Sequence, residues 1–168
     1  MILLRPFVTA DFDQLIGWSA NKEMLMQYAG PSFDFPLTTE QLALNLADAS
    51  RLAYSIQFNS TGEAIGHAEI YFPNKTTAHL CRILIGDAGY RGRGIGSMVV
   101  KQLLAISFAI EGVEEASLNV YDWNQAAVKC YASAGFEINK DGTRTRQVND
   151  KVWTTLNMRL AKKKWANL

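Results

Sequence analysis

Residues 80–96 read LCRILIGDAGYRGRGIG and join an apolar strand pattern to a helical pattern through a run of glycines. Glycine costs about 1 kcal/mol relative to alanine inside a helix, so Gly92, Gly94 and Gly96 favour a loop over a helix. Backbone N–H groups of such a loop can point into one concave space at a helix N-terminus and bind an anion. Arg91 and Arg93 add positive charge that suits phosphate. The stretch predicts a strand, a phosphate-binding loop and a helix, although glycines alone fit a tight turn equally well.

Two well-known phosphate motifs do not match this loop. A Walker A loop needs Gly-Lys followed by Ser or Thr, and Gly96 precedes Ser97 with no lysine between them. The dinucleotide fingerprint needs two residues between its second and third glycines, whereas Gly94 and Gly96 are separated by one. The loop therefore predicts a phosphate ligand of another kind.

The pattern Arg91-x-x-Gly94-x-Gly96 resembles the acyl-CoA pyrophosphate loop of the GNAT N-acetyltransferase superfamily. The family's second signature follows in the right order, as Asn124-x-x-Ala127-x-x-x-Tyr131-x-x-x-Gly135-Phe136. The resemblance covers roughly residues 1–160, and its specific part is residues 78–136. The two ends resemble the branch that includes ribosomal-protein, polyamine and amino-sugar acetyltransferases.

The resemblance implies an α/β fold, with a mixed, largely antiparallel sheet flanked by helices that binds acyl-CoA. Acetyl-CoA would be the acyl donor. Amides of the strand would hold the pantetheine arm, the loop and the helix start would hold the pyrophosphate, and an amide side chain would contact the cofactor arm. The residues implied are Ile83, Leu84 and Ile85 for the strand, Arg91, Gly92, Arg93, Gly94, Ile95, Gly96 and Ser97 for the loop, and Asn124 for the amide. Asn124 is also a natural helix N-cap, which alone would explain it.

Length and composition indicate one globular domain over residues 1–168. The net charge of +1 gives no argument for nucleic acid as a partner, and no apolar run approaches a membrane span. Met1 leads directly into a strand pattern without a signal peptide, which predicts a cytoplasmic protein. Cys81 and Cys130 lie far apart and form no metal-binding spacing, so no metal site is expected.

The chain in order predicts a strand at 2–5, helices at 11–18, 21–28 and from 38 to about 50, and an antiparallel meander from 53 to 85. A helix from Ile95 joins this meander to a strand at 116–121, which should lie parallel to residues 80–85. A helix over 124–134 and a hairpin with a turn at Asn149-Asp150 follow. Residues 162–165 are expected to form a solvated tail. In the family, the N-terminal helices and their connecting loop help to wall the acceptor pocket.

Tyr131 is the candidate general acid. A phenol with a pKa near 10 can give a proton to a departing thiolate of similar basicity. In isolation a tyrosine at this position would more often be a core aromatic, and its place within the family signature reverses that preference.

The general base is less clear from the sequence. Glu69 lies in the strand before the cofactor-binding one and could deprotonate an ammonium through water, and we take it as the candidate catalytic base. His67 and His79 also lie on central strands, and their side chains have a suitable pKa. Each of the three would also fit as a hydrogen-bonded or salt-bridged residue. Some protein N-terminal acetyltransferases carry a glutamate where this chain has Asn119, which weakens a protein-acetylating function.

We expect an enzyme that transfers an acetyl group from acetyl-CoA to a primary amine by direct attack, without a covalent enzyme intermediate. The acceptor could be a small-molecule amine or a protein N-terminal amine, and a homodimer is possible. A non-catalytic acyl-CoA-binding or regulatory domain is the alternative. A Rossmann-type nucleotide-binding domain would need several parallel βαβ units, and the antiparallel meander counts against it.

Overall fold

The computed structural model describes residues 1–148 and 150–168. Seven strands of the described chain pair in the order β1-β2-β3-β4-β5-β7-β6. By contacts the chain divides into two compact units, each made of two segments, and each unit is described below by itself. Unit 1 comprises Met1–Tyr71 and Cys81–Val99, and unit 2 comprises Phe72–Leu80 and Val100–Leu168. The chain therefore passes between the units three times: between Tyr71 and Phe72, within β4 (Thr77–Ile85) and within α4 (Ile95–Ala109).

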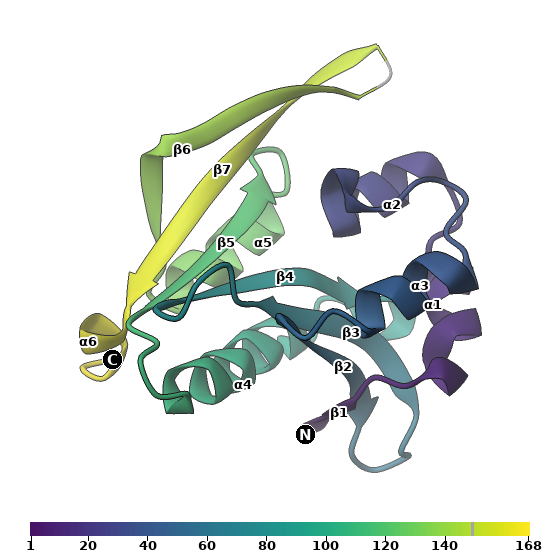
Figure 1. The fold of residues 1–168 in the computed structure, drawn as a ribbon, viewed down its shortest axis with the longest axis horizontal. Coiled ribbons are helices and arrows are strands. Elements are labelled where there is room, and N and C mark those ends of the chain that lie inside the picture. The colour runs from purple at the N-terminus through teal and green to yellow at the C-terminus, as the bar shows by residue number, and fades with distance from the viewer. Residues whose placement is uncertain (149) are drawn as a thin grey trace. The chain divides into compact units, whose positions relative to one another are not determined.

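Unit 1 contains an antiparallel ribbon and a set of short helices (Figure 1). Its strands and helices are β1 (Ile2–Pro6), η1 (Thr9–Asp11), α1 (Phe12–Trp18), α2 (Lys22–Ala29), η2 (Gly30–Ser32), α3 (Thr39–Leu46), β2 (Arg51–Phe58), β3 (Ala64–Tyr71) and η3 (Ala88–Tyr90). β1 pairs antiparallel with β2, and β2 pairs antiparallel with β3. Two helix starts follow the sequence signals: Asn21 Oδ1 accepts a hydrogen bond from Met24 N at 2.8 Å, and Thr38 Oγ1 accepts one from Gln41 N at 3.3 Å.

Apolar side chains of the helices form the core of unit 1. The buried members of this core are Phe7, Phe12, Leu15, Leu25, Tyr28, Ala29, Phe33, Leu37 and Leu42. Leu84 of β4 is half-buried and packs against this core. The second half of β4 and the helices α1 to α3 are thus held together by one apolar cluster.

Unit 2 contains β5 (Glu115–Tyr121), α5 (Gln125–Ser133), β6 (Glu137–Val148), β7 (Lys151–Ala161) and α6 (Lys162–Trp165). β5 lies parallel to the first half of β4, as expected, and antiparallel to β7. β6 and β7 form a long twisted antiparallel hairpin (Figure 1). The sheet is mixed and largely antiparallel, so the expected fold class is confirmed and a Rossmann arrangement is excluded.

Three details differ from the sequence-based expectations or lie outside what the structure describes. α3 ends at Leu46, about one helical turn before Ser50, because the side chain of Asp48 accepts hydrogen bonds from Ser50 in a turn. Residues 162–165 form the short helix α6, and Trp165 packs against Phe108 with ring centroids 5.1 Å apart. The expected turn at Asn149-Asp150 includes Asn149, which lies outside the described residues.

Candidate active site

The strand β4 changes its pairing and its backbone conformation at one point. Within the described residues, β4 pairs with β5 over Thr77–Leu80 and no further. Two residues later Arg82 has a φ of 52°, in the left-handed region that costs a non-glycine residue roughly 1 kcal/mol or more. Residues Ile83 to Ile85 follow, so their backbone groups lie beyond the end of the parallel ladder. This is the strand segment that the sequence assigns to the pantetheine arm.

The loop after β4 has the backbone conformation expected of an anion cradle. Gly92 and Gly94 both have a φ of 74°, which favours glycine, and no atom lies within 4 Å of where a Cβ would stand at either position. The loop is exposed and leads directly into α4, a helix of 15 residues whose first-turn N–H groups have no intrahelical acceptor. Glycine amides and a helix N-terminus at one place fit the pyrophosphate of CoA.

Side chains around the loop brace it against β4. Arg91 Nε donates to Ile85 O at 2.9 Å, and Arg91 Nη2 donates to Gly86 O at 3.1 Å. Arg93 lies over the ring of Tyr90 with its guanidinium carbon 5.6 Å from the centroid. Arg91 therefore closes the loop onto the strand, while its predicted contact with pyrophosphate remains a prediction.

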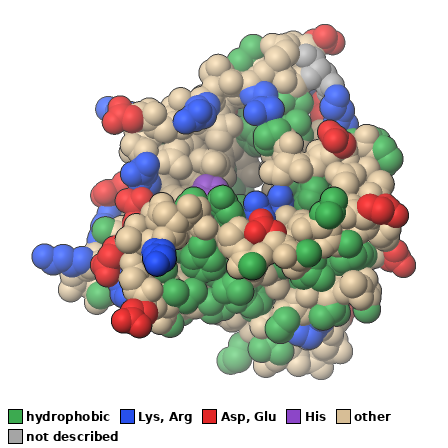
Figure 2. Space-filling model, in the orientation of Figure 1, with side chains coloured by type: hydrophobic (Ala, Val, Ile, Leu, Met, Phe, Trp, Pro, Cys, Tyr) green, Lys and Arg blue, Asp and Glu red, His purple; other side chains and the backbone are tan. Residues whose placement is uncertain are grey.

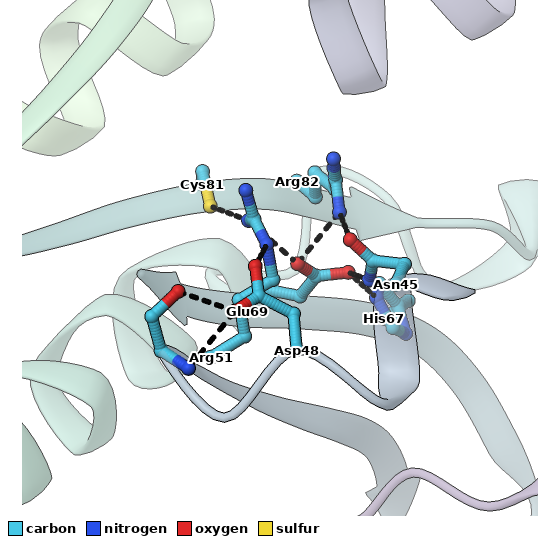
Figure 3. A network of polar contacts seen from close by, with 8 residues as sticks. Asn45, Asp48, Arg51, His67, Glu69, Cys81 and Arg82 are labelled. Atoms are coloured by element: carbon cyan, nitrogen blue, oxygen red, sulfur yellow. Dashed lines mark hydrogen bonds and ion pairs between the residues drawn. The ribbon is translucent and has the colours of Figure 1, made fainter. Parts of the chain in front are cut away.

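The predicted base Glu69 lies at the centre of a buried polar network in unit 1 (Figure 3). Its carboxylate is 1% exposed. One oxygen, Oε1, accepts from Asn45 Nδ2 at 2.8 Å and from His67 Nε2 at 3.0 Å. The other, Oε2, accepts from Arg82 Nη1 at 2.8 Å and from Arg51 Nη1 at 3.3 Å. The four partners use the lone-pair positions that a carboxylate offers.

This environment sets the protonation state of Glu69. Burial would raise the pKa, but the hydrogen bond from His67 and the positive charge of Arg82 outweigh it and lower the pKa of Glu69 to about 2. A carboxylate with so low a pKa and no free lone pair is a weak acceptor of a substrate proton. The geometry of Glu69 does not favour the predicted role of general base, and that role remains untested.

Arg82, Arg51 and Asn45 belong to this network, and the sequence-based expectations did not include them. Arg82 Nη1 also donates to Asn45 Oδ1, and the guanidinium carbon lies 4.2 Å from the ring centroid of Phe33. The sequence contained a signal: Arg82 interrupts an apolar strand and Glu69 interrupts another. Two opposite charges in buried strands of one sheet are expected to pair.

The two remaining predicted residues lie on α5 in unit 2. Asn124 Oδ1 accepts from Ala127 N at 3.3 Å and thus caps the helix. Tyr131 is half-buried, and its ring meets that of Phe136 edge-on with centroids 6.3 Å apart. Burial, reinforced by the neighbouring Cys130, raises the pKa of Tyr131. Tyr131 therefore keeps its proton at neutral pH, as a general acid must.

His79, the third candidate base after Glu69 and its partner His67, lies in unit 2 within a row of hydrogen-bonded side chains. Its Nδ1 is 2.9 Å from Ser117 Oγ, and its Nε2 is 3.5 Å from Asn119 Nδ2. The row continues as Asn157 Nδ2 donates to Asn119 Oδ1 at 2.9 Å, and Asn139 Nδ2 donates to Asn157 Oδ1 at the same distance. Amide side chains orient one another here, but an amide cannot act as a base.

Other site types find no support in the described residues. No group of three His, Cys, Asp or Glu side chains there could hold a metal ion. Among the same residues, no helix is long and apolar enough to cross a membrane. Basic and acidic side chains are interspersed on the face shown in Figure 2, in keeping with the net charge of +1.

Comparisons with known proteins agree with this geometry. The chain is similar over 99% of its length to spermidine N-acetyltransferase from Vibrio cholerae in complex with CoA and spermine, with 20% identity, 98% of that chain covered and a TM-score of 0.81. It is similar over 99% of its length to an aminoglycoside acetyltransferase in complex with coenzyme A and kanamycin, with 21% identity, 98% of that chain covered and a TM-score of 0.75. At this identity the two structures show a shared fold.

A family model supplies the assignment. The model of the acetyltransferase (GNAT) family matches residues 18–136, which include the strand, the loop, both predicted signatures and the whole Glu69 network. This match spans well over half of the 168 residues. The chain belongs to the acetyltransferase (GNAT) family.

Proposed function

We propose that this protein transfers the acetyl group of acetyl-CoA to a primary amine by direct attack within a ternary complex. The observation that carries the proposal is the second half of β4 lying beyond the parallel ladder and leading, through two left-handed glycines, into the N-terminus of α4. The strand edge suits the amide-rich pantetheine arm, and the loop suits the pyrophosphate.

The donor would be held by main-chain groups of the strand and the loop. In the proposal, amides of Ile83, Leu84 and Ile85 hold the arm, and the segment from Arg91 to Ser97 holds the pyrophosphate. Asn124 keeps its capping bond and can still offer its Nδ2 group to the arm. Bound acetyl-CoA supplies an activated thioester carbon.

The proposed acetyl transfer needs only Tyr131 and water as proton carriers. The neutral amine attacks the thioester carbon, the bond from carbon to sulfur breaks, and the thiolate takes a proton from Tyr131. The acceptor nitrogen loses two protons, one as the ammonium before the attack and one after the bond from nitrogen to carbon forms. Water accepts both, because the carboxylate of Glu69 already accepts four hydrogen bonds. Water and bulk solvent then restore the proton to Tyr131.

The test combines cofactor binding with turnover. Calorimetry measures CoA binding, and thiol release against a panel of amines measures transfer, for the wild type and for Tyr131→Phe. Loss of a general acid lowers kcat by roughly 10²- to 10⁴-fold. Tyr54→Phe, which removes the hydroxyl of another half-buried tyrosine in β2, is the matched control and should retain wild-type turnover.

The same experiment separates the alternative function. A wild type that binds CoA and releases no thiol with any amine would support a non-catalytic acyl-CoA-binding or regulatory domain. Absence of CoA binding would contradict both functions, since both need the loop.

The class of acceptor and the assembly state belong to the proposal as well. We propose a small-molecule amine as the acceptor in preference to a protein N-terminal amine, since Asn119 occupies the position where some protein N-terminal acetyltransferases have a glutamate. A spermidine N-acetyltransferase of similar fold, with a TM-score of 0.79, is dodecameric. The proposed homodimer of this chain can be tested by sedimentation at several protein concentrations.

A further inference from the structure

Arg82 is an arginine placed where a strand residue would normally be apolar. It is 6% exposed, its backbone is left-handed, and its guanidinium lies against the ring of Phe33. A conformation that costs free energy persists only when the surroundings fix it. Glu69 and Asn45 do so by binding one nitrogen of the guanidinium, Nη1.

The rest of the guanidinium has hydrogen-bonding capacity to spare. Among the residues that the structure describes, Arg82 Nε and Nη2 have no acceptor. Figure 3 shows one guanidinium nitrogen of Arg82 turned toward Asn45 and Glu69, and another turned away from the network. An arginine offers five N–H donors in a rigid fork, and neither free nitrogen of Arg82 is among the fully buried, unpartnered polar atoms of the described residues, so this edge can be reached. Arg82 thus presents a fixed, unpartnered edge that fits a planar anion.

The ion pairs and hydrogen bonds of the network engage only one nitrogen of Arg82. Arg82 shares its one carboxylate partner, Glu69, with Arg51 and with His67. Arg51 has a second carboxylate, Asp48, at 2.9 Å, whereas Arg82 has none. The two arginines and the two carboxylates of the network therefore balance in formal charge, and what Arg82 retains is a set of unused hydrogen-bond donors.

The elements around Arg82 are those that face an acceptor in the sequence-based expectation. Asn45 belongs to α3, and Phe33 belongs to the loop between the N-terminal helices, which in this family help to wall the acceptor pocket. Arg82 itself immediately precedes the strand segment proposed to hold the pantetheine arm. A receptor at this position would act on the acceptor and not on the CoA phosphates, which the glycine loop holds.

We propose that Arg82 binds a carboxylate of the acceptor, so that the acceptor is an amine that also carries a carboxylate, as an α-amino acid does. This inference rests on the proposed acetyl transfer. A polyamine carries several positive charges and no carboxylate, so it offers no anionic acceptor for the free N–H groups of Arg82.

The experiment measures kcat/KM by thiol release for matched acceptors. Each α-amino acid is compared with its own carboxamide, and spermidine serves as the polycationic acceptor. For each protein, kcat/KM for the amino acid is divided by kcat/KM for its carboxamide. The readout is this ratio in a variant relative to the wild type, because differences in amine basicity then cancel. Charge-assisted hydrogen bonds to a fork predict that Arg82→Gln lowers the ratio roughly 10- to 100-fold. Arg82→Lys, which keeps the charge without the fork, should give a smaller loss.

Arg51→Gln is the matched control. It removes the other arginine that binds Glu69 Oε2 but leaves the free edge of Arg82, so the ratio should stay near that of the wild type. A second measurement needs no variant. Calorimetry on the wild-type protein with CoA bound should show that an N-acetylated amino acid binds more tightly than the carboxamide of the same N-acetylated amino acid. Equal binding of the two would count against the proposal even if Arg82 variants fail to fold.

Other outcomes are distinguishable. A ratio unchanged in Arg82→Gln, or a wild type that acetylates spermidine and no carboxylate-bearing amine, would overturn the assignment while leaving acetyl transfer intact. Succinyl-CoA carries a carboxylate on its acyl group. If carboxamides react with succinyl-CoA but not with acetyl-CoA, and only when Arg82 is present, then Arg82 binds the acyl donor and the inference is wrong. CoA binding without acetylation of any amine would contradict the proposed function itself.

Discussion

Glu69 shows how a buried charge is tolerated in a sheet. An isolated ionised carboxylate in a protein interior is very unfavourable, and pairing with hydrogen-bonding cations makes it acceptable. Here two arginines, a histidine and an amide surround the carboxylate. Removal of the negative charge would leave Arg82 with its strained backbone and no ionic partner, so this network is expected to hold β4 in its left-handed turn.

The first prediction concerns the pH dependence of stability. The folded pKa of Glu69, about 2, lies below its usual value of 4.5, so its contribution is present above about pH 4.5 and is lost as the pH falls toward 2. The shift corresponds to roughly 3 kcal/mol of unfolding free energy. Glu69→Gln should show a shallower decline between pH 4.5 and 2 in urea unfolding. At pH 7 the variant should be less stable by about 3 kcal/mol or more.

Asp48→Asn is the control for this prediction. Asp48 also pairs with Arg51 and accepts hydrogen bonds from Ser50, but its side chain is 39% exposed, so solvent screens the pair. Its effect on the unfolding free energy at pH 7 should therefore be smaller than that of Glu69→Gln. Equal pH profiles for wild type and Glu69→Gln would show that the network does not stabilise the ionised carboxylate.

The network also shows what single residues in the sequence can and cannot reveal. The sequence indicates Glu69 as a candidate base on the strand before the cofactor-binding one, but three of its four partners come from β2, β4 and α3, which only the fold brings together. Spacing along the chain does not show that Asn45 reaches Glu69 across 24 residues. The role of base is expected because Glu69 is a glutamate and lies on the strand before the cofactor-binding one. A glutamate in that position can equally well be an ion-paired residue.

At the scale of elements, the loop between β4 and α4 is determined by glycines. Gly86 allows Trp18 to pack directly on the end of β4, since a Cβ there would stand 2.0 Å from the indole. Gly92 and Gly94 serve a different purpose, because they take up left-handed conformations in open space. The first glycine therefore serves packing, and the other two serve the direction in which the loop amides point.

The second prediction separates loop conformation from general stability. Gly94→Ala should raise the CoA dissociation constant about tenfold or more, because a left-handed alanine costs roughly 1 to 2 kcal/mol and the loop can relax away from the binding conformation. Gly62→Ala is matched to it: Gly62 has a φ of 71°, also in open space, but lies in the turn between β2 and β3. Both variants should lose similar stability, and Gly94→Ala alone should lose CoA affinity.

A result in which both variants bind CoA as the wild type does would contradict the role of the loop. Calorimetry with CoA and thermal unfolding of the same samples are sufficient to decide. If Gly62→Ala weakened CoA binding equally, the effect would have to be attributed to lower stability and not to the loop.

Most elements could be predicted from the sequence because local signals and burial agree in them. Asn21, Thr38 and Asn124 are caps in the structure as they are in the sequence. The parallel placement of β5 followed from the helix between it and β4. The end of α3 and the docking of α6 through Trp165 could not be predicted, since a side-chain turn and a distant aromatic partner decide them.

At the scale of the whole molecule, the two units are intertwined in sequence. Each consists of two segments, and the chain crosses between them at the end of β3, inside β4 and inside α4. Neither unit can therefore be excised as one continuous stretch of chain. A boundary inside a strand or a helix differs from the exposed linkers at which independent domains usually separate.

The last prediction tests the expectation of a single domain over residues 1–168. Because unfolding of either unit would break a strand and a helix that continue into the other, we expect one cooperative transition in urea. Tryptophan fluorescence can report on each unit separately. Trp18 is the tryptophan of unit 1, and a variant with phenylalanine at Trp123, Trp153 and Trp165 reports on it alone. A second variant that retains only Trp153 reports on unit 2, where this side chain is buried.

Coincident midpoints for the two variants, each compared with circular dichroism of the same sample, would support one cooperative domain. CoA sharpens the test, since a ligand at 100 times its dissociation constant adds about 2.7 kcal/mol to the stability of whatever unfolds with its site. The glycine loop of the proposed donor site belongs to unit 1. In a single domain, CoA should move both midpoints by the same amount. A shift confined to Trp18 would mean that the units unfold independently.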